Sequence, residues 1–322
     1  MSPGPSAVPL SFEWEGLRLV GTLHPPADGS AGTGRDETRS VDRRWPAVVM
    51  AQGSGPADRD CGGYFPPIRD AFLRAGIATF AFDKPGCGES EGDWYHYGLL
   101  GRGDQLIAAL DLLRHQPTVD ADRVGLWGQS QGGWLVQLLA GGRTPLAFAI
   151  ANSAPTLTVA QQIHHDIEQT LRAAGHGDAD VEQALALADA LHTAATDGTT
   201  HEAATAELLA PAEQYDWYRH FPGIDGPDDW RHLGLLVGEP FDPCAALARV
   251  ECPILAVYGA LDALLPPWRG AEETGVALAS APTTDAAVVV FPTGDHRIRH
   301  GDGTFAPGYL DLLGDWARRV IG

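Results

Sequence analysis

Short apolar runs, each closed by a turn signal, recur along most of the chain. Six of them follow residue 45: PAVVMA, IATFAF, RVGLWG, LAFAIA, PILAVYG and AAVVVFP. Patterns with helical spacing lie between several of these runs, such as GDQLIAALDLLRHQ and QGGWLVQLLAGG. Continuous apolar strands that alternate with amphipathic helices predict an α/β fold, in which helices cover both faces of a mainly parallel sheet.

The first 44 residues and the last segment of the chain depart from this alternation of buried strands and helices. Residues 8–26 alternate apolar and polar side chains around Glu15-Gly16, which predicts an antiparallel hairpin. Residues 27–44 are rich in Gly, Ser and charge without periodicity, so we expect a surface loop there. The last segment, residues 309–321, has the spacing of a closing helix.

One long stretch interrupts the alternation of strands and helices. Residues 155–245 show helical patterns without a buried strand, and their 16 acidic and 3 basic residues supply most of the net charge of −20. We expect a helical cap, residues 155–245, inserted into a core made of residues 1–154 and 246–322. Its aromatic residues either line a pocket or attach the cap to the core, and both alternatives stay open: Tyr215, Trp217, Tyr218, Phe221 and Trp230.

Composition narrows the classes of function. The net charge of −20 argues against nucleic acid and anionic membranes as partners, because both require a basic surface. No apolar run is long enough to span a bilayer and the N-terminus has no signal-peptide pattern, so we expect a cytoplasmic protein. The four cysteines are scattered, which predicts reduced and mostly buried thiols without a disulfide framework or zinc site. The oligomeric state stays open, a homodimer included.

The segment RVGLWGQSQGGWLVQLL holds the strongest candidate for chemistry. An apolar strand enters residues 128–132, GQSQG, and a helix leaves them, which is the context of a nucleophile elbow. Such a sharp turn needs glycine at its flanks and presents the serine hydroxyl at the helix N-terminus. The pattern predicts that Ser130 is a nucleophile.

A serine hydroxyl needs a base to remove its proton, and that base needs an orienting carboxylate. In a parallel sheet these partners gather at the carboxyl ends of strands. Asp262 follows PILAVYG and His296 follows AAVVVFP, in the order Ser, Asp, His expected after such an elbow. Each rival is weaker, since Asn152 is an amide, His300 lies a turn too late, and Asp295 is expected to shape the turn.

Together these segments resemble the α/β-hydrolase superfamily, and within it the capped bacterial carboxylesterases and acyl-peptidase-like serine hydrolases. The motifs that carry the resemblance are GQSQGG, YGALDALLPP, GDHRI, FDKPGCGESEG and QGSGPADRD. The last of these resembles an HGSGP-type loop, with Gln52 where histidine is usual. The resemblance implies an oxyanion hole formed by two backbone N–H groups. One is assigned to Ser54, and the other, that of the residue after the nucleophile, is assigned to Gln129. We expect residues 58–60 to form a local ion-pair network that holds this loop.

The resemblance implies a carboxylesterase-type serine hydrolase that acts on a small acyl substrate. It would cleave an ester or thioester, with an amide as a further option, through an acyl-enzyme on Ser130. His296 would act as general base and acid, while Asp262 orients its ring. No cofactor and no metal is implied. The adjacent His164 and His165 lack a metalloenzyme spacing and are interpreted as solvated surface residues.

Two other functions stay open. A biosynthetic acyltransferase or cyclase would use the same three residues with an acceptor other than water. A non-catalytic binding protein of the same fold is disfavoured, because such proteins typically lose a member of the triad. A phosphate-binding NTPase is weaker still, because QGSGPADRD lacks the Lys-Ser/Thr ending of a P-loop.

Overall fold

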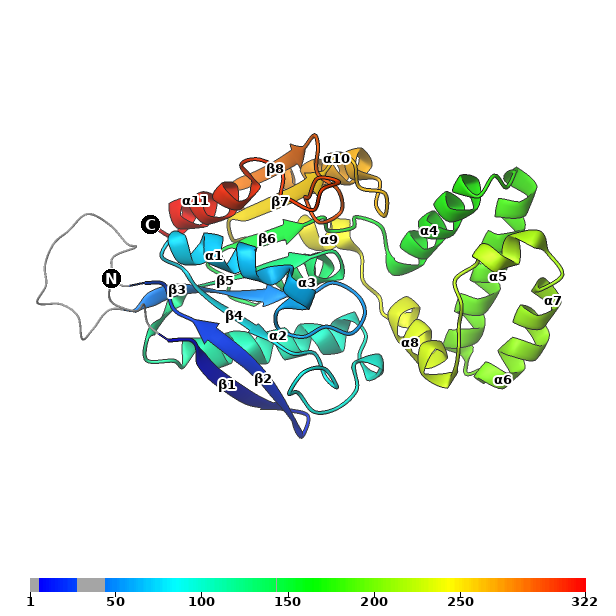
Figure 1. Cartoon of the computed structure of the whole chain (residues 1–322), viewed down its shortest axis with the longest axis horizontal. Helices are drawn as coiled ribbons and strands as arrows, with labels where there is room; N and C mark the ends of the chain where they lie inside the picture. The colour runs from blue at the N-terminus through cyan, green and yellow to red at the C-terminus, as the bar shows by residue number, and fades with distance from the viewer. Residues whose placement is uncertain (1–5, 28–43, 143) are drawn as a thin grey trace, which may run out of the picture. The chain divides into compact units, whose positions relative to one another are not determined.

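The computed structural model describes residues 6–27, 44–142 and 144–322, so the surface loop expected at residues 27–44 lies almost entirely outside the described residues. Within these ranges, an eight-stranded sheet runs through the centre of the fold (Figure 1). Its strand order is β1-β2-β4-β3-β5-β6-β7-β8. The predicted α/β fold is confirmed.

The sheet is antiparallel at one edge and parallel elsewhere. β1 (Val8–Trp14) and β2 (Leu17–His24) form the predicted hairpin, with Trp14 opposite Leu17. β2 then pairs antiparallel with β4, and all later pairings are parallel. The other strands are β3 (Trp45–Ala51), β4 (Ala78–Phe82), β5 (Val119–Gln129), β6 (Ala149–Asn152), β7 (Ile254–Gly259) and β8 (Ala286–Phe291).

Helices cover both faces of the sheet, because its central strands are buried on both sides. On one face α1 (Phe65–Arg74) packs beside α11 (Tyr309–Ile321), as Figure 1 shows. On the other face α3 contacts α9, and α9 contacts α10. α2 packs on α3, since a Cβ on Gly103 would lie 3.2 Å from Leu138. The bounds of this second group are α2 Leu99–Arg114, α3 Gln131–Ala140, α9 Pro243–Leu247 and α10 Pro267–Leu278.

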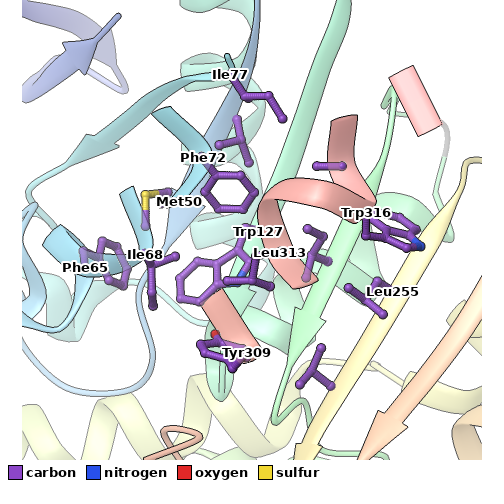
Figure 2. Packing of buried hydrophobic residues seen from close by; sticks show 14 of the residues in the cluster. Met50, Phe65, Ile68, Phe72, Ile77, Trp127, Leu255, Tyr309, Leu313 and Trp316 are labelled. Carbon is purple, nitrogen blue, oxygen red and sulfur yellow. The ribbon is translucent and has the colours of Figure 1, made fainter. Parts of the chain in front are cut away.

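A large hydrophobic core lies between the sheet and the α1/α11 pair (Figure 2). Trp127 of β5 is fully buried there. Its ring packs edge-to-face against that of Phe65, with the ring centroids 5.3 Å apart. Leu313 and Trp316 of α11 reach the same cluster. Burial of these large side chains, rather than local propensity, attaches the two helices to the sheet.

The helical stretch between β6 and β7 contributes to a separate compact unit. This second unit comprises residues 95–101 and 157–242, and the first comprises residues 1–94, 102–156 and 243–322. A capping box joins Thr158 and Gln161 at the start of the first long helix of the second unit. The helices of this unit are α4 (Val159–Ala173), α5 (Asp178–Asp197), α6 (His201–Ala204), α7 (Ala210–Ala212) and α8 (Pro227–Gly238), with a π-helical turn at Thr205–Leu209.

Two aromatic residues of the second unit fill its own interior. Trp217 belongs to an apolar cluster with residues of α4 and α5, and Trp230 belongs to a second cluster beside it. Both indole rings are almost fully buried, while Tyr215 is exposed and stacks on Trp217. The two tryptophans therefore stabilise the second unit itself, a role that neither of the expected alternatives described.

Two expectations from composition can be compared with the structure. All four cysteines are free thiols, and each is half-buried rather than buried as expected. Across the described ranges, no helix combines the length and the apolar character that a membrane span requires.

Packing in the core between the sheet and the α1/α11 pair predicts how two valine substitutions change the free energy of unfolding. Val257 of β7 is fully buried in this core, whereas Val276 of α10 is 67% exposed. We expect Val257→Ala to lower the free energy of unfolding by about 2 kcal/mol, because it removes two buried methyl groups and leaves a cavity. Val276→Ala should change it by less than about 0.5 kcal/mol. Urea denaturation followed by tryptophan fluorescence measures both, and equal losses would contradict the assignment of the core.

Candidate active site

Ser130 lies at the turn between β5 and α3 in a backbone conformation that L-residues rarely adopt. Its φ is +58° and its ψ is −120°. Its N–H donates to the Asn152 carbonyl at 2.9 Å, and its carbonyl accepts the Gly133 N–H at 2.7 Å. Strain of this kind costs on the order of 1–3 kcal/mol and persists only where the surrounding contacts enforce it.

Glycines permit this turn because the backbone of α3 approaches the strands closely. A Cβ on Gly128 would lie 2.2 Å from the Gly132 carbonyl oxygen. A Cβ on Gly132 would lie 2.3 Å from the carbonyl oxygen of Ala51, at the end of β3. Real side chains do not make such contacts, so the glycines predicted on both flanks of Ser130 are required by the packing.

Asp262 and His296 meet at the carboxyl ends of β7 and β8. The His296 Nδ1 donates to Asp262 Oδ2 at 2.7 Å, and the Asp262 side chain has no exposed surface. The other carboxylate oxygen accepts the backbone N–H groups of Leu264 and Leu265, at 2.8 and 3.0 Å. Asp262 thereby fixes the orientation of the imidazole and keeps its Nε2 as the nitrogen available for proton transfer.

The rivals of these residues have structural partners of their own. The side-chain oxygen of Asn152 accepts the Tyr309 hydroxyl at 2.7 Å in the interior. Asp295 accepts the backbone N–H groups of Arg297 and Arg299, each at 2.8 Å, and so shapes the turn after β8. These contacts leave Asp262 as the carboxylate that orients His296.

A single side-chain hydrogen bond links the Ser130 turn to the histidine loop. Gln129 Nε2 donates to the His296 carbonyl oxygen at 3.3 Å. No hydrogen bond joins the Ser130 hydroxyl to the His296 ring within the described part of the chain. The structure therefore pairs Asp262 with His296 directly and brings Ser130 near them through its neighbour.

The loop after β3 lies against Ser130. A Cβ on Gly53 would be 3.4 Å from the Ser130 Cβ and 3.0 Å from the side-chain oxygen of Gln129. Gln52 is buried, and its amide donates to the Phe82 carbonyl at 2.6 Å and to the Asp58 carbonyl at 3.3 Å. Gln52 thus ties the start of the loop to the end of β4.

Two buried cations hold the same loop by its carbonyl groups, and the sequence patterns did not identify either of them. Lys84 Nζ donates to the carbonyl oxygens of Gly53 and Gly55. The Arg102 guanidinium donates to the Gln52 carbonyl at 3.0 Å, to the Gly53 carbonyl at 3.4 Å and to the side-chain oxygen of Gln131. One signal was present for Lys84, which is the sole lysine of a chain that otherwise uses arginine.

Burial of these cations has an electrostatic consequence. Removal from water lowers the pKa of Lys84 well below its usual 10.5, and the nearby charge of Arg102 lowers it further. Burial also lowers the pKa of Arg102 to about 10. Both groups donate to carbonyl and amide oxygens, and no carboxylate forms an ion pair with either of them among the described residues, so their positive charge is not cancelled locally.

Peptide geometry converts these contacts into a direction for one N–H group. In a trans peptide the C=O and N–H bonds of one unit point in opposite directions. Lys84 binds the Gly53 carbonyl, so the N–H of Ser54, which shares that peptide unit, points away from Lys84. The expected oxyanion donor is therefore held by a cation on the reverse side of its own peptide.

The assignment of a donor to the Gln129 backbone is wrong. Gln129 precedes Ser130 and is the last residue of β5, so its backbone belongs to the strand. The N–H that follows the nucleophile belongs to Gln131, the first residue of α3. A helix N-terminus leaves such N–H groups without partners in the helix, which makes Gln131 the better-placed donor.

Ion pairs hold Arg59 and Asp60, whereas the carboxylate of Asp58, expected in the same network, accepts the backbone N–H groups of Asp60 and Gly62. Arg59 contacts Asp83 and also Glu89, the latter at 2.6 Å. Asp60 pairs with Arg69 at 2.9 Å. The network is therefore not local, because it joins this loop to the segment after β4 and to α1.

Known proteins resemble the chain in sequence and in fold. An Escherichia coli protein, described as an uncharacterized 31.7 kDa protein in the traX-finO intergenic region, is 24% identical over 258 residues, covering 77% of this chain and 83% of that protein. A Pyrococcus furiosus esterase superposes with a TM-score of 0.62 at 14% identity, covering 98% of this chain and 91% of that one. Est1E of Butyrivibrio proteoclasticus, solved with ferulic acid bound, gives a TM-score of 0.55 at 16% identity, covering 96% of each chain.

A thermophilic esterase from Thermogutta terrifontis, solved with malate bound, gives a TM-score of 0.56 at 17% identity, covering 99% of this chain and 100% of that one. At these identities the structural likeness concerns the fold alone. The sequence itself matches the Alpha/beta hydrolase family over residues 48–305, which extend from β3 past the Asp262 and His296 loops. The family predicted from the motifs is confirmed, and the chain belongs to the alpha/beta hydrolase family.

Proposed function

We propose that the chain is a carboxylesterase-type serine hydrolase that forms an acyl-enzyme on Ser130. The observation that carries this proposal is the buried Asp262–His296 pair at the same strand ends as a serine held in a strained strand-to-helix turn. Esterases among its structural neighbours support the same reaction class. The substrate is a carboxylic ester or thioester.

In the proposed reaction His296 first accepts a proton and then returns it, while Ser130 carries the acyl group between the two steps. The Ser130 hydroxyl attacks the acyl carbon while His296 Nε2 removes its proton, then returns that proton to the leaving group. Asp262 holds the tautomer in which Nδ1 carries hydrogen. Water then attacks the acyl-enzyme with His296 as base. Rotation of the serine side chain in the substrate complex brings its hydroxyl to the imidazole, as catalytic hydrogen bonds often tighten only with substrate.

The oxyanion of the tetrahedral intermediate would lie between two backbone donors, the N–H groups of Ser54 and Gln131. The Ser54 N–H is oriented by the contact of Lys84 with the Gly53 carbonyl, and the Gln131 N–H belongs to the first residue of α3. Donors of this kind each lower the barrier by on the order of 3 kcal/mol when they are held before charge develops. Arg102 connects the two donor segments, because it binds both the Gln52 carbonyl and the Gln131 side chain.

Exposed apolar side chains near Asp262 support a substrate with an apolar acyl or aryl group. Leu261 and Leu264 flank this carboxylate and are 64% and 53% exposed, and Trp268 at the start of α10 is 64% exposed. All three lie within residues 261–268, and we take this exposed apolar segment as the surface that binds the acyl or aryl group. The ferulic acid held by Est1E, an aromatic acid, is of the same chemical type. We also propose that residues 155–245 act as a cap that selects the substrate.

The proposed reaction predicts that Ser130→Ala lowers kcat/KM for a p-nitrophenyl ester by about 10⁴-fold or more, because no other group replaces the nucleophile. A fluorophosphonate should add once to the wild-type protein and not to the variant, as read by intact-protein mass spectrometry.

Ser280→Ala provides the matched control, because Ser280 is exposed beyond the end of α10. It should keep both turnover and labelling. A Ser130→Ala protein that is folded by circular dichroism and still hydrolyses the ester would disprove the mechanism. Product analysis with an added alcohol or amine separates hydrolysis from acyl transfer.

The contacts of Lys84 predict a loss of rate without a loss of substrate binding. Lys84→Met keeps the length of the side chain but removes the Lys84 hydrogen bonds to the Gly53 and Gly55 carbonyls. The Gly53 carbonyl keeps the longer 3.4 Å contact with Arg102, so the Ser54 N–H is held less firmly. We expect kcat to fall on the order of ten- to hundred-fold with KM within about twofold, because the lost interaction belongs to the transition state.

Arg69→Met is the control for this variant. It removes another cation, one that pairs with Asp60 near the same loop and contacts none of the loop carbonyls. Its kcat should stay near the wild-type value. An unchanged kcat in Lys84→Met would show that the cation does not position the donor.

Lys84 also predicts a pH dependence of stability. Between its lowered pKa in the folded protein and its usual 10.5, the unfolded chain holds a proton on Lys84 that the folded chain has released. The free energy of unfolding should therefore rise with pH in this alkaline window, as the cost of the buried charge disappears. Urea denaturation at several pH values measures this slope, which should be smaller in Lys84→Met. Equal slopes in the two proteins would contradict the prediction.

A further inference from the structure

A group of three side chains closes one end of the interface between α4 and α5. His164 lies one turn before Ile167 on α4, and His192 lies one turn after Ala188 on α5, on the faces that pack together. Asp189 precedes His192 by three residues and so shares its side of α5. The apolar contact between the two helices therefore ends in two imidazoles and a carboxylate.

Distances within this group match those of a metal site. His164 Nε2 lies 2.9 Å from Asp189 Oδ1, and the two imidazole rings are nearly parallel with centroids 5.8 Å apart. One ligand atom from each of the three residues lies within 4.8 Å of the others. Ligands of a tetrahedral zinc ion are separated by about 3.3–3.5 Å, given bonds of about 2.0–2.2 Å, so small side-chain rotations complete the geometry.

The interpretation of His164 as a solvated surface residue is wrong. Only 30% of its side chain is exposed, and its Nε2 is buried without a well-oriented hydrogen bond to Asp189. Asp189 is 68% exposed, so an ion pair of this kind contributes little by itself. A bound cation would satisfy the buried nitrogen, the carboxylate and the facing imidazole at once.

We propose that His164, Asp189 and His192 form a binding site for a divalent transition metal ion of the zinc class. Two neutral imidazoles and one carboxylate are ligands that Zn²⁺, Co²⁺ and Ni²⁺ accept, and they leave a fourth position for water. The ion cross-links α4 to α5 at the end opposite their connecting turn, so it stabilises the second unit. It takes no part in the proposed acyl chemistry, which uses residues of the first unit.

The full-length protein, freed of metal by a chelator, should be titrated with Co²⁺. Its visible d–d absorption reports nitrogen and oxygen ligation at a site of low coordination number. We expect one such Co²⁺ per chain, displaced by Zn²⁺. Saturation with Zn²⁺ should raise the thermal midpoint on the order of 5 °C, because an ion that binds only the folded state stabilises it.

Variants separate this site from the other histidines and acidic groups of the chain. His192→Ala should weaken Co²⁺ binding at least 100-fold and abolish the thermal shift, and Asp189→Asn should weaken binding about tenfold without affecting folding, because this side chain is exposed. His165→Ala, at the neighbouring half-buried histidine, should leave binding unchanged. The proposal is overturned if wild type binds no Co²⁺ with d–d absorption, or if His192→Ala and Asp189→Asn bind it as wild type does.

Discussion

Direct backbone contact between α3 and the end of β3 is the constraint on which the candidate site depends. A Cβ on Gly132 would lie 2.3 Å from the Ala51 carbonyl oxygen and 2.8 Å from that of Gln52. The helix that begins after Ser130 and the loop that begins at Gln52 are therefore adjacent because no side chain separates them. Ser130 adopts its positive φ at this point of close approach, so the strained turn and the loop meet at the same backbone contact.

Two buried cations then orient the loop that packing has placed beside Ser130. Lys84 and Arg102 lose hydration in the interior, and within the described residues they donate to carbonyl and amide oxygens of the site. This arrangement is unfavourable for stability, as the lowered pKa of Lys84 shows, because no carboxylate neutralises the charges. The same contacts set the direction of backbone N–H groups, because a cation bound to a carbonyl fixes the N–H on the opposite side of that peptide unit. In the proposed mechanism, stability is thus reduced in favour of a preorganised donor.

Contacts that follow from the order of the strands could be predicted from the sequence. Contacts that depend on how side chains pack could not. Asp262 and His296 could be placed together because parallel strands bring their carboxyl ends to one edge, and their 2.7 Å contact follows from that rule. The contact of Lys84 with Gly53 joins residues 31 positions apart, and no periodicity in the sequence encodes it. The meeting of His164 with His192 likewise requires the register of α4 against α5, which an HExxH-type motif search cannot detect.

Gln52 is the point where the loop departs from the HGSGP pattern it resembles, and its surroundings give a physical reason. Its amide supplies an N–H to the Phe82 carbonyl, a bond that an imidazole N–H would also supply. An imidazole can acquire a proton, however, and Arg102 already places a positive charge on the Gln52 carbonyl, with Lys84 close by on Gly53. A third charge in this buried space would be repelled by both. A carboxamide stays neutral at every pH, so it ties the loop to β4 without competing with the cations that orient the donor.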